Sequence, residues 1–283
     1  AMQFKNIRIL VALLIAGLSF AIAISDAGAG DYPWLSEAPR REIESALAPP
    51  AGFERVVVAA DSFAGWLRRL PLAPAGTAVV LHDGRPLVDQ SIIAAVVNID
   101  TGTSDLQQCA DAVMRLRAEF LYSRGLLGAI GFDLVNSERY PFSAYSRGAT
   151  PRQEGAGITL ASEKPRGAGH SDLRRYLDLL FGFASTRSLA KELQPVPSLR
   201  DAEIGDVFIR AGQPGHAMII ADMAVNASGQ RLVLLVQGSM PARGIYLLNN
   251  TRHPDLGAWF EVADGQPLIT PGYEFRPDEL RRF

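Results

Sequence analysis

The chain has 283 residues, of which 48% are hydrophobic and 20% are charged, and its formal net charge is −2. These values are typical of a globular protein that can bury a large core. An extended nucleic-acid-binding surface would require a basic excess that this chain lacks, so we expect no nucleic-acid partner.

A targeting segment is predicted at residues 1–29. Lys5 and Arg8 make its start positive, residues 9–24 are apolar or small, and Ala27-Gly28-Ala29 provides an A-x-A cleavage site. We therefore expect cleavage near Ala29 and an exported protein, periplasmic or secreted, with no membrane span in the mature chain. An uncleaved N-terminal anchor is the alternative, but the apolar run is shorter than the roughly 20 residues that span a bilayer.

The remaining residues, 30–283, are predicted to form a single α+β domain, with 30–52 as a lead-in segment. Strands are expected at 53–59 and 91–99, a helix at 63–70 after Asp61 or Ser62, and a hairpin that pairs 77–81 with 85–88. Residues 131–169 are rich in Gly, Ser, Arg and Pro, and we expect a long irregular insertion that frames a cleft or is simply loop.

The strongest helix pattern follows Asp105, which we expect to cap it, with Gln108 at the spacing of a capping box. The segment CADAVMRLRAEFL contains strong helix formers. It places Cys109, Val113, Leu116 and Phe120 on one stripe. Two more helices are expected at 172–183, after Ser171, and at 186–193, after Ser185.

A run of strands closes the chain, at 207–209, 217–223, 232–236, 259–262 and 268–275, before a turn at 277–280. Helices and strands are thus segregated along the sequence, which predicts an α+β fold in which the long helix packs on an antiparallel sheet.

A hairpin is predicted around the turn residues Asn226-Ala227-Ser228-Gly229. If these four residues are the whole loop, His216 faces Ser239 and Met218 faces Gln237. Because side chains alternate across a strand, His216, Gln237 and Ser239 would then share one face. A loop one residue longer or shorter would reverse that parity.

Cys109 is the only cysteine, which rules out an intrachain disulfide and a structural cysteine–zinc cluster. A free thiol in an oxidising compartment is either buried or used. The four histidines lie far apart without zinc-protease spacing, and no nucleotide-binding glycine signature occurs in a fitting context. We therefore expect neither a metal nor a cofactor.

Four segments carry a family resemblance: SFAGWLRRLPL (62–72), DLQQCADAVMRLRAEFL (105–121), GDVFIRAGQPGHAMII (205–220) and LVQGSMPA (235–242). They resemble a family of exported bacterial proteins described as domain of unknown function 4846. The likeness covers nearly all of the mature chain, and it implies no particular activity.

A second resemblance lies in the order of elements. Cys109 with the small Ala110 begins a helix, the strand Gly205-Asp206-Val207-Phe208 comes later, His216 opens a strand, and Gln237 lies on the next. This order is similar to that of papain-like amidases of the NlpC type. The chain departs from that family because Gln-Cys-Ala-Asp replaces Asp-Cys-Ser-Gly and the Cys-to-His separation is longer than in compact members.

The resemblance implies a papain-like arrangement in which Cys109 is the nucleophile, His216 the base and Gln237 the residue that orients the imidazole. A helix N-terminus and a nearby histidine stabilise a thiolate. Gln107 or Gln108 could donate a hydrogen bond to an oxyanion.

Structural roles compete with each of these functional ones. If Asp105 caps the helix, Cys109 is its fourth residue, where the dipole effect fades, and free cysteines are usually buried. Asp206 could support the site, cap a turn or pair with Arg210, and Ser239 could support the site or end a strand.

The sequence therefore leads to the hypothesis of an exported bacterial cysteine hydrolase that acts on an amide bond, in a peptide or glycan-peptide such as cell-wall peptide. The alternative is a non-catalytic envelope protein that keeps this architecture to bind a peptide or glycan.

Overall fold

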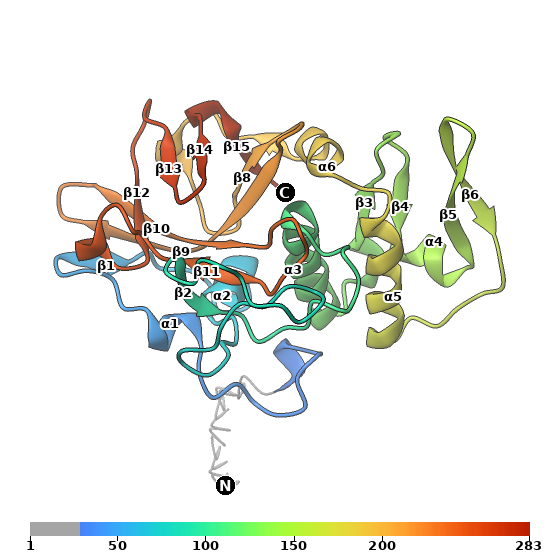
Figure 1. The fold of residues 1–283 in the computed structure, drawn as a ribbon, viewed down its shortest axis with the longest axis horizontal. Helices are drawn as coiled ribbons and strands as arrows, with labels where there is room; N and C mark the ends of the chain where they lie inside the picture. The colour runs from blue at the N-terminus through green and yellow to red at the C-terminus, as the bar shows by residue number, and fades with distance from the viewer. Residues whose placement is uncertain (1–28) are drawn as a thin grey trace, which may run out of the picture.

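The computed structural model describes residues 29–283 (Figure 1), so the predicted targeting segment lies outside the described residues except for its last position. None of the helices within 29–283 is long and apolar enough to cross a bilayer. The α-helices of the described part are α1 Ile43–Ala46, α2 Phe63–Arg68, α3 Cys109–Ser123, α4 Phe142–Ser146, α5 His170–Phe181 and α6 Thr186–Glu192.

The described residues form a nine-stranded sheet in which the main order is β2-β11-β10-β9-β8-β15-β7, with β1 paired to β9 and β12 paired to β10. All of these pairs are antiparallel. The strands are β1 Phe53–Arg55, β2 Ile93–Val96, β7 Gln194–Pro195, β8 Val207–Arg210, β9 His216–Asn226, β10 Arg231–Gln237, β11 Tyr246–Leu248, β12 Trp259–Val262 and β15 Leu280–Arg282. The predicted α+β class with an antiparallel sheet is confirmed.

Three small hairpins lie outside this sheet: β3 Gly131–Asp133 with β4 Arg139–Pro141, β5 Ala149–Glu154 with β6 Gly157–Ser162, and β13 Leu268–Thr270 with β14 Tyr273–Phe275. The prediction that 131–169 is irregular was therefore wrong. Its many glycines and serines belong to turns and short strands. Figure 1 shows β5, β6 and α4 on the far side of α5 from the sheet, and β3 and β4 above α5. The hairpin predicted to pair 77–81 with 85–88 is only partly formed. It consists of a turn and a single bridge between Val80 and Pro86.

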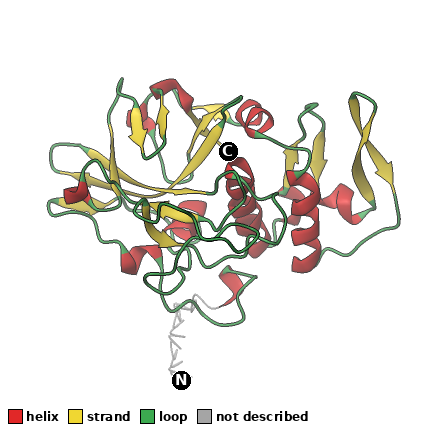
Figure 2. Ribbon diagram, in the orientation of Figure 1, coloured by secondary structure: helices red, strands yellow, loops and turns green. Residues whose placement is uncertain are grey.

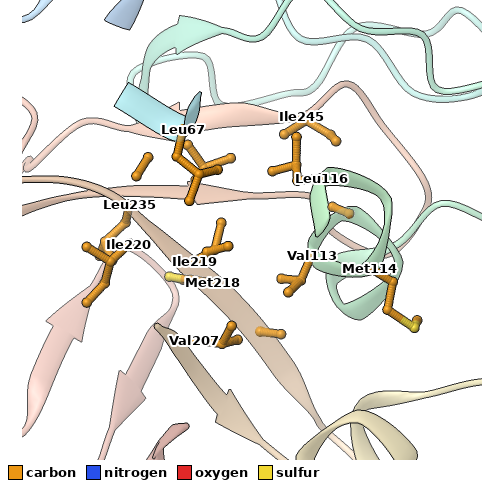
Figure 3. Packing of buried hydrophobic residues seen from close by; sticks show 14 of the residues in the cluster. Leu67, Val113, Met114, Leu116, Val207, Met218, Ile219, Ile220, Leu235 and Ile245 are labelled. Carbon is orange, nitrogen blue, oxygen red and sulfur yellow. The ribbon is translucent and has the colours of Figure 1, made fainter. Parts of the chain in front are cut away.

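Helix α3 lies between the sheet on one side and α5 on the other, and Figure 2 shows the two helices next to each other. In Figure 3, Val113 of α3 is directed toward Ile219 of β9, while Met114 points away from the strands. Both side chains are buried, because each side of the helix has its own covering layer. Burial on two sides holds α3 in a fixed position relative to β9 and β10.

The starts of the helices were predicted with mixed success. Ser62 and Ser185 cap α2 and α6 as expected, each accepting a bond from a backbone N–H. Helix α5 begins after Gly169 rather than after Ser171. Asp105 does not cap α3: Gln108 is the N-cap, and the Asp111 carboxylate accepts from the Gln108 backbone N–H at 2.9 Å. Cys109 is therefore the first residue of α3, not the fourth.

In the β9–β10 hairpin, two departures from the predicted register cancel each other. Val225 faces Arg231 instead of the expected Gln230, because the loop is one residue longer than predicted. A bulge between Leu234 and Leu235 absorbs that residue, so Val236 faces Ile219 beyond it. Continuing this register pairs Met218 with Gln237, which is the pairing the four-residue loop predicted for this end of the hairpin.

The end of β10 packs against the start of α3 at Gly238. A Cβ at this position would lie 2.7 Å from the Gln108 carbonyl oxygen and 3.0 Å from the Ala112 Cβ. Only glycine allows this approach without moving the helix or the strand end.

We expect Gly238→Ala to lower the free energy of unfolding by about 1–3 kcal/mol, because the new methyl group overpacks the contact between β10 and α3. Denaturant unfolding measures the change. Gly244→Ala is the matched control, since its Cβ would meet Val96 at 3.8 Å, an ordinary contact. Equal destabilisation by both substitutions would contradict the close approach.

Candidate active site

A cleft of about 630 Å³ opens where the start of α3, the β8–β9 loop, the start of α6 and the segment after β10 meet. Four of the site residues singled out from the sequence line it together, namely Gln108, Cys109, His216 and Ser239. Its volume lies in the range of roughly 300–1,000 Å³ that is usual for small-ligand sites.

Cys109 lies at the base of this cleft as the first residue of α3, and it is 9% exposed. The backbone N–H groups of Ala110 and Ala217 stabilise its thiolate form. Ala217 follows His216 directly in β9. The sulfur therefore lies against the end of β9 that carries the histidine.

His216 is the first link in a chain of hydrogen bonds that crosses three strands. Its Nε2 lies 2.6 Å from Gln237 Oε1, and Gln237 Nε2 donates to the Tyr246 hydroxyl at 2.5 Å. Because the Gln237 amide nitrogen is used by Tyr246, its oxygen accepts and His216 Nε2 is the donor. This tautomer leaves Nδ1 of His216 as the free acceptor.

Tyr273, in β14, covers the histidine. Its ring stacks on His216 with 4.0 Å between centroids, and its hydroxyl donates to the Gly215 carbonyl at 3.1 Å. Burial raises the pKa of Tyr273, and the charge of a Cys109 thiolate raises it further. Tyr273 is thus near both the imidazole and the thiol.

Burial determines the charge states of the Cys109 thiol and the His216 imidazole. It raises the pKa of Cys109 to about 11, with a smaller contribution from the negative charge of Asp111. It lowers the pKa of His216 to about 4, although the hydrogen bond to Gln237 acts in the opposite direction. At neutral pH the unliganded site therefore contains a thiol and a neutral imidazole, whereas the helix start alone favours a thiolate.

The predicted supporting residues separate into two groups. Gln108 lines the cleft and its side-chain amide donates to Asp105 Oδ1 at 3.1 Å, while Ser239 lies partly buried at the rim. Gln107 does not line the cleft: it is fully buried and accepts from Arg115 at 3.0 Å. Gln107 is therefore not placed to donate to an oxyanion in this cleft.

Asp206 is also remote from the cleft lining. It is buried and accepts from the Arg282 Nε at 2.6 Å, which ties β15 to the start of β8. Of the two structural roles considered for it, the turn cap forms, because Asp206 Oδ2 accepts from the Glu203 backbone N–H at 2.8 Å. The pairing with Arg210 does not form, because Arg210 binds Glu279 at 2.9 Å. Asp206 holds the sheet together and has no direct contact with the site.

Sequence reasoning did not identify Tyr246, Tyr273 or Asp111 as site residues. Tyr246 lies on a strand whose pairing partner no local turn reveals, and Tyr273 comes from a hairpin outside the main sheet. Asp111 is three residues after the N-cap of α3, where a carboxylate is ordinary helix chemistry. None of the three had a sequence signal of its own, apart from a polar group among apolar neighbours.

Residues 43–282 match the family described as domain of unknown function (4846), and the chain belongs to that family. No curated protein and no solved structure matches the chain. The geometry of the cleft is therefore the basis for a functional assignment.

The buried His216 makes stability depend on pH. Since its pKa in the folded protein is about 4 and its ordinary value is 6.5, the unfolded chain takes up the proton first. This stabilisation is complete above pH 6.5 and is lost as the pH falls toward 4, by at most about 3 kcal/mol.

We expect His216→Gln to flatten the decline in unfolding free energy between pH 7 and 4, as measured by urea unfolding. His253→Gln, at an exposed histidine, is the control, and identical pH profiles for wild type and His216→Gln would refute the assignment.

Proposed function

We propose that this protein is an exported cysteine hydrolase with a papain-like arrangement, which cleaves an amide bond in a peptide or glycan-peptide such as cell-wall peptide. The observation that carries the proposal is the chain Tyr246–Gln237–His216, because it orients an imidazole with a free Nδ1 at the strand end where the Cys109 sulfur lies. Export is supported by the sequence pattern of residues 1–29 alone.

The papain-like arrangement is supported by the order and contacts of the elements. A helix that begins at the cysteine packs on β9 and β10, and these adjacent antiparallel strands carry the histidine and its orienting amide. The same order occurs in the NlpC-type amidases that the sequence resembles.

In the proposed reaction, the substrate amide enters the cleft with its carbonyl carbon next to the Cys109 sulfur. His216 Nδ1 takes the thiol proton as sulfur bonds to that carbon, and the resulting imidazolium keeps its bond to Gln237 Oε1. When the C–N bond breaks, His216 returns the proton to the leaving amine, and a thioester remains on Cys109. Water then attacks the thioester with His216 as base, which releases the carboxylic acid and restores the thiol.

Proton transfer accompanies the attack in this mechanism, because the resting thiol and imidazole are both neutral at pH 7. Two donors at the helix start serve the developing oxyanion. As the first residue of α3, Cys109 has a backbone N–H without an intrahelical acceptor. Gln108 offers the second hydrogen of its side-chain amide, since only one is used by Asp105.

The buried, neutral thiol favours a second candidate function, in which the same cleft binds a peptide or glycan without cleaving it. A pKa of about 11 leaves on the order of one thiolate in 10⁴ molecules at pH 7. This function differs from the first in that substitution of Cys109 leaves it intact.

Hydrolysis is tested by incubating the mature protein with cell-wall peptide fragments and unrelated peptides, and detecting released amines by mass spectrometry. We expect Cys109→Ala to lower turnover at least about 10³-fold, and Gln237→Ala to lower kcat about 10- to 100-fold with little change in KM. A covalent thioester on Cys109 should be trapped at low pH. Full turnover by Cys109→Ala would contradict the proposal, and peptide binding without turnover in wild type would support the second function.

Tyr246 is predicted to act as a positioning residue through Gln237. We expect Tyr246→Phe to lower kcat about 3- to 10-fold and the free energy of unfolding by about 1 kcal/mol, because Gln237 loses its hydrogen-bond partner. Tyr145→Phe, which alters a buried tyrosine of α4 far along the chain from the cleft residues, is the control. An unchanged kcat for Tyr246→Phe with an equal stability loss would limit Tyr246 to a structural role.

A further inference from the structure

The cleft is lined by acidic side chains and by no cationic ones among the described residues. Asp105 and Asp111 both line it, while no lysine or arginine is among the described residues of its lining. The other ionisable groups there, Cys109, His216 and Tyr273, are neutral at pH 7 because burial moves each pKa away from neutrality. A bound molecule therefore meets negative charge on Asp105, and on Asp111 once that group ionises, but no positive charge from the described lining.

Asp111 has unused hydrogen-bonding capacity. It is only 6% exposed, and its Oδ2 accepts from the Gln108 backbone N–H at 2.9 Å. Its Oδ1 has no hydrogen-bond partner among residues 29–283. A buried carboxylate oxygen without a partner is costly, so a ligand that donates a hydrogen bond there would stabilise the site.

Asp105 also bonds to Gln108, through the side chain of that residue. Its Oδ1 accepts from the Ala242 backbone N–H at 2.6 Å and from the Gln108 side chain at 3.1 Å, and its side chain is exposed at the rim. The bond from Ala242, followed by that from Gln108, lowers the pKa of Asp105, so this group is ionised at neutral pH. Both carboxylates thus bond to Gln108, which directly precedes Cys109.

We propose that the cleft selects amide substrates that carry an ammonium group close to the scissile carbonyl, with Asp111 accepting its hydrogen bonds and Asp105 attracting it at the rim. This inference rests on the proposed hydrolase function, and it specifies the substrate class of that function. A free α-amine or a short side-chain amine next to the cleaved bond has the required chemistry.

The electrostatics of the thiol give the ammonium a second effect. Burial raises the pKa of Asp111 to about 8, and its negative charge when ionised opposes formation of the Cys109 thiolate. A bound ammonium would keep Asp111 ionised and offset its repulsion of the thiolate. The substrate would then supply the positive charge that the described lining lacks.

Charged thiol reagents test this selectivity without a known substrate. Native protein is treated with the ammonium reagent 2-aminoethyl methanethiosulfonate, neutral methyl methanethiosulfonate, and anionic 2-sulfonatoethyl methanethiosulfonate. In each case the Cys109 thiolate attacks the reagent disulfide-like S–S bond, a mixed disulfide forms, and methanesulfinate leaves. Rates are divided by those for 2-mercaptoethanol, and their ratios do not depend on the thiolate fraction.

We expect the ammonium reagent to react at least about tenfold faster than the sulfonate on this scale. The ratio should increase between pH 6 and 9 as Asp111 ionises. At pH 9 it should fall at least about threefold in Asp111→Asn, and at pH 7 and 9 alike it should fall at least about threefold in Asp105→Asn. Asp255→Asn removes an exposed carboxylate outside the cleft and should leave the ratio unchanged.

Two results would overturn the inference, and they are distinguishable. If all three reagents modify Cys109 at equal normalised rates, the cleft is accessible but not cation-selective, and the hydrolase proposal stands without this substrate class. If none of them modifies native Cys109 although all modify the unfolded chain, the thiol is sealed and the hydrolase proposal itself fails. Wild-type protein decides both points, so neither depends on whether Asp111→Asn folds.

Discussion

The structure of the site depends on how closely the start of α3 approaches the ends of β9 and β10. Gly238 leaves room for the Gln108 carbonyl and Ala112 on one side, and the Ala217 N–H faces the Cys109 sulfur on the other. A helix held at the usual distance from a sheet by larger side chains would separate the sulfur from His216. The approach thus brings together residues that are more than a hundred positions apart in the chain.

The same approach determines the electrostatics. A helix N-terminus stabilises a nearby anion by roughly 0.3–1 kcal/mol, and this falls off within the first turn. The increase in the pKa of Cys109 to about 11 corresponds to about 3 kcal/mol against the thiolate, so burial outweighs the helix. Because burial also keeps His216 neutral, the two groups differ from a preformed thiolate–imidazolium pair.

Local patterns predicted the parts of the site that depend on strand alternation and helix periodicity. Residues His216 and Gln237 were placed on one face from the turn at 226–229, and their side chains do meet. That result depended on two deviations that cancel, a longer loop and a bulge beside Asp222. Asp222, at the bulge, is buried and accepts from Arg55 and Arg68, which come from distant segments, so the contacts around the bulge are not local ones.

The start of α3 was misplaced for a similar reason. Asp105 has the residue type and spacing of a cap, but its carboxylate is taken by the Ala242 backbone N–H from beyond β10. Likewise, Gln107 was expected near the oxyanion, whereas Arg115 draws its side chain into the interior. The Asp105 contact spans 137 residues of sequence, so no pattern within a short window contains it. Gln107 and Arg115 are only eight residues apart, but their helix spacing does not show which polar side chain is drawn inward.

The buried carboxylates of this protein show which group is exceptional. Four other carboxylates among the described residues are buried, and each has at least one guanidinium that compensates for its burial. The pairs are Asp206 with Arg282, Asp222 with Arg55 and Arg68, Glu119 with Arg115, and Glu279 with Arg210. Such pairs add little net stability, but removing one partner is costly because a buried charge is left uncompensated. Asp111 is also buried, at 6% exposure, but its only partner is a backbone N–H, and one of its oxygens is unbonded among the described residues. Since the fold supplies an arginine to each of the other four buried carboxylates and none to the one beside Cys109, the missing cation at Asp111 is a property of the cleft rather than of the core.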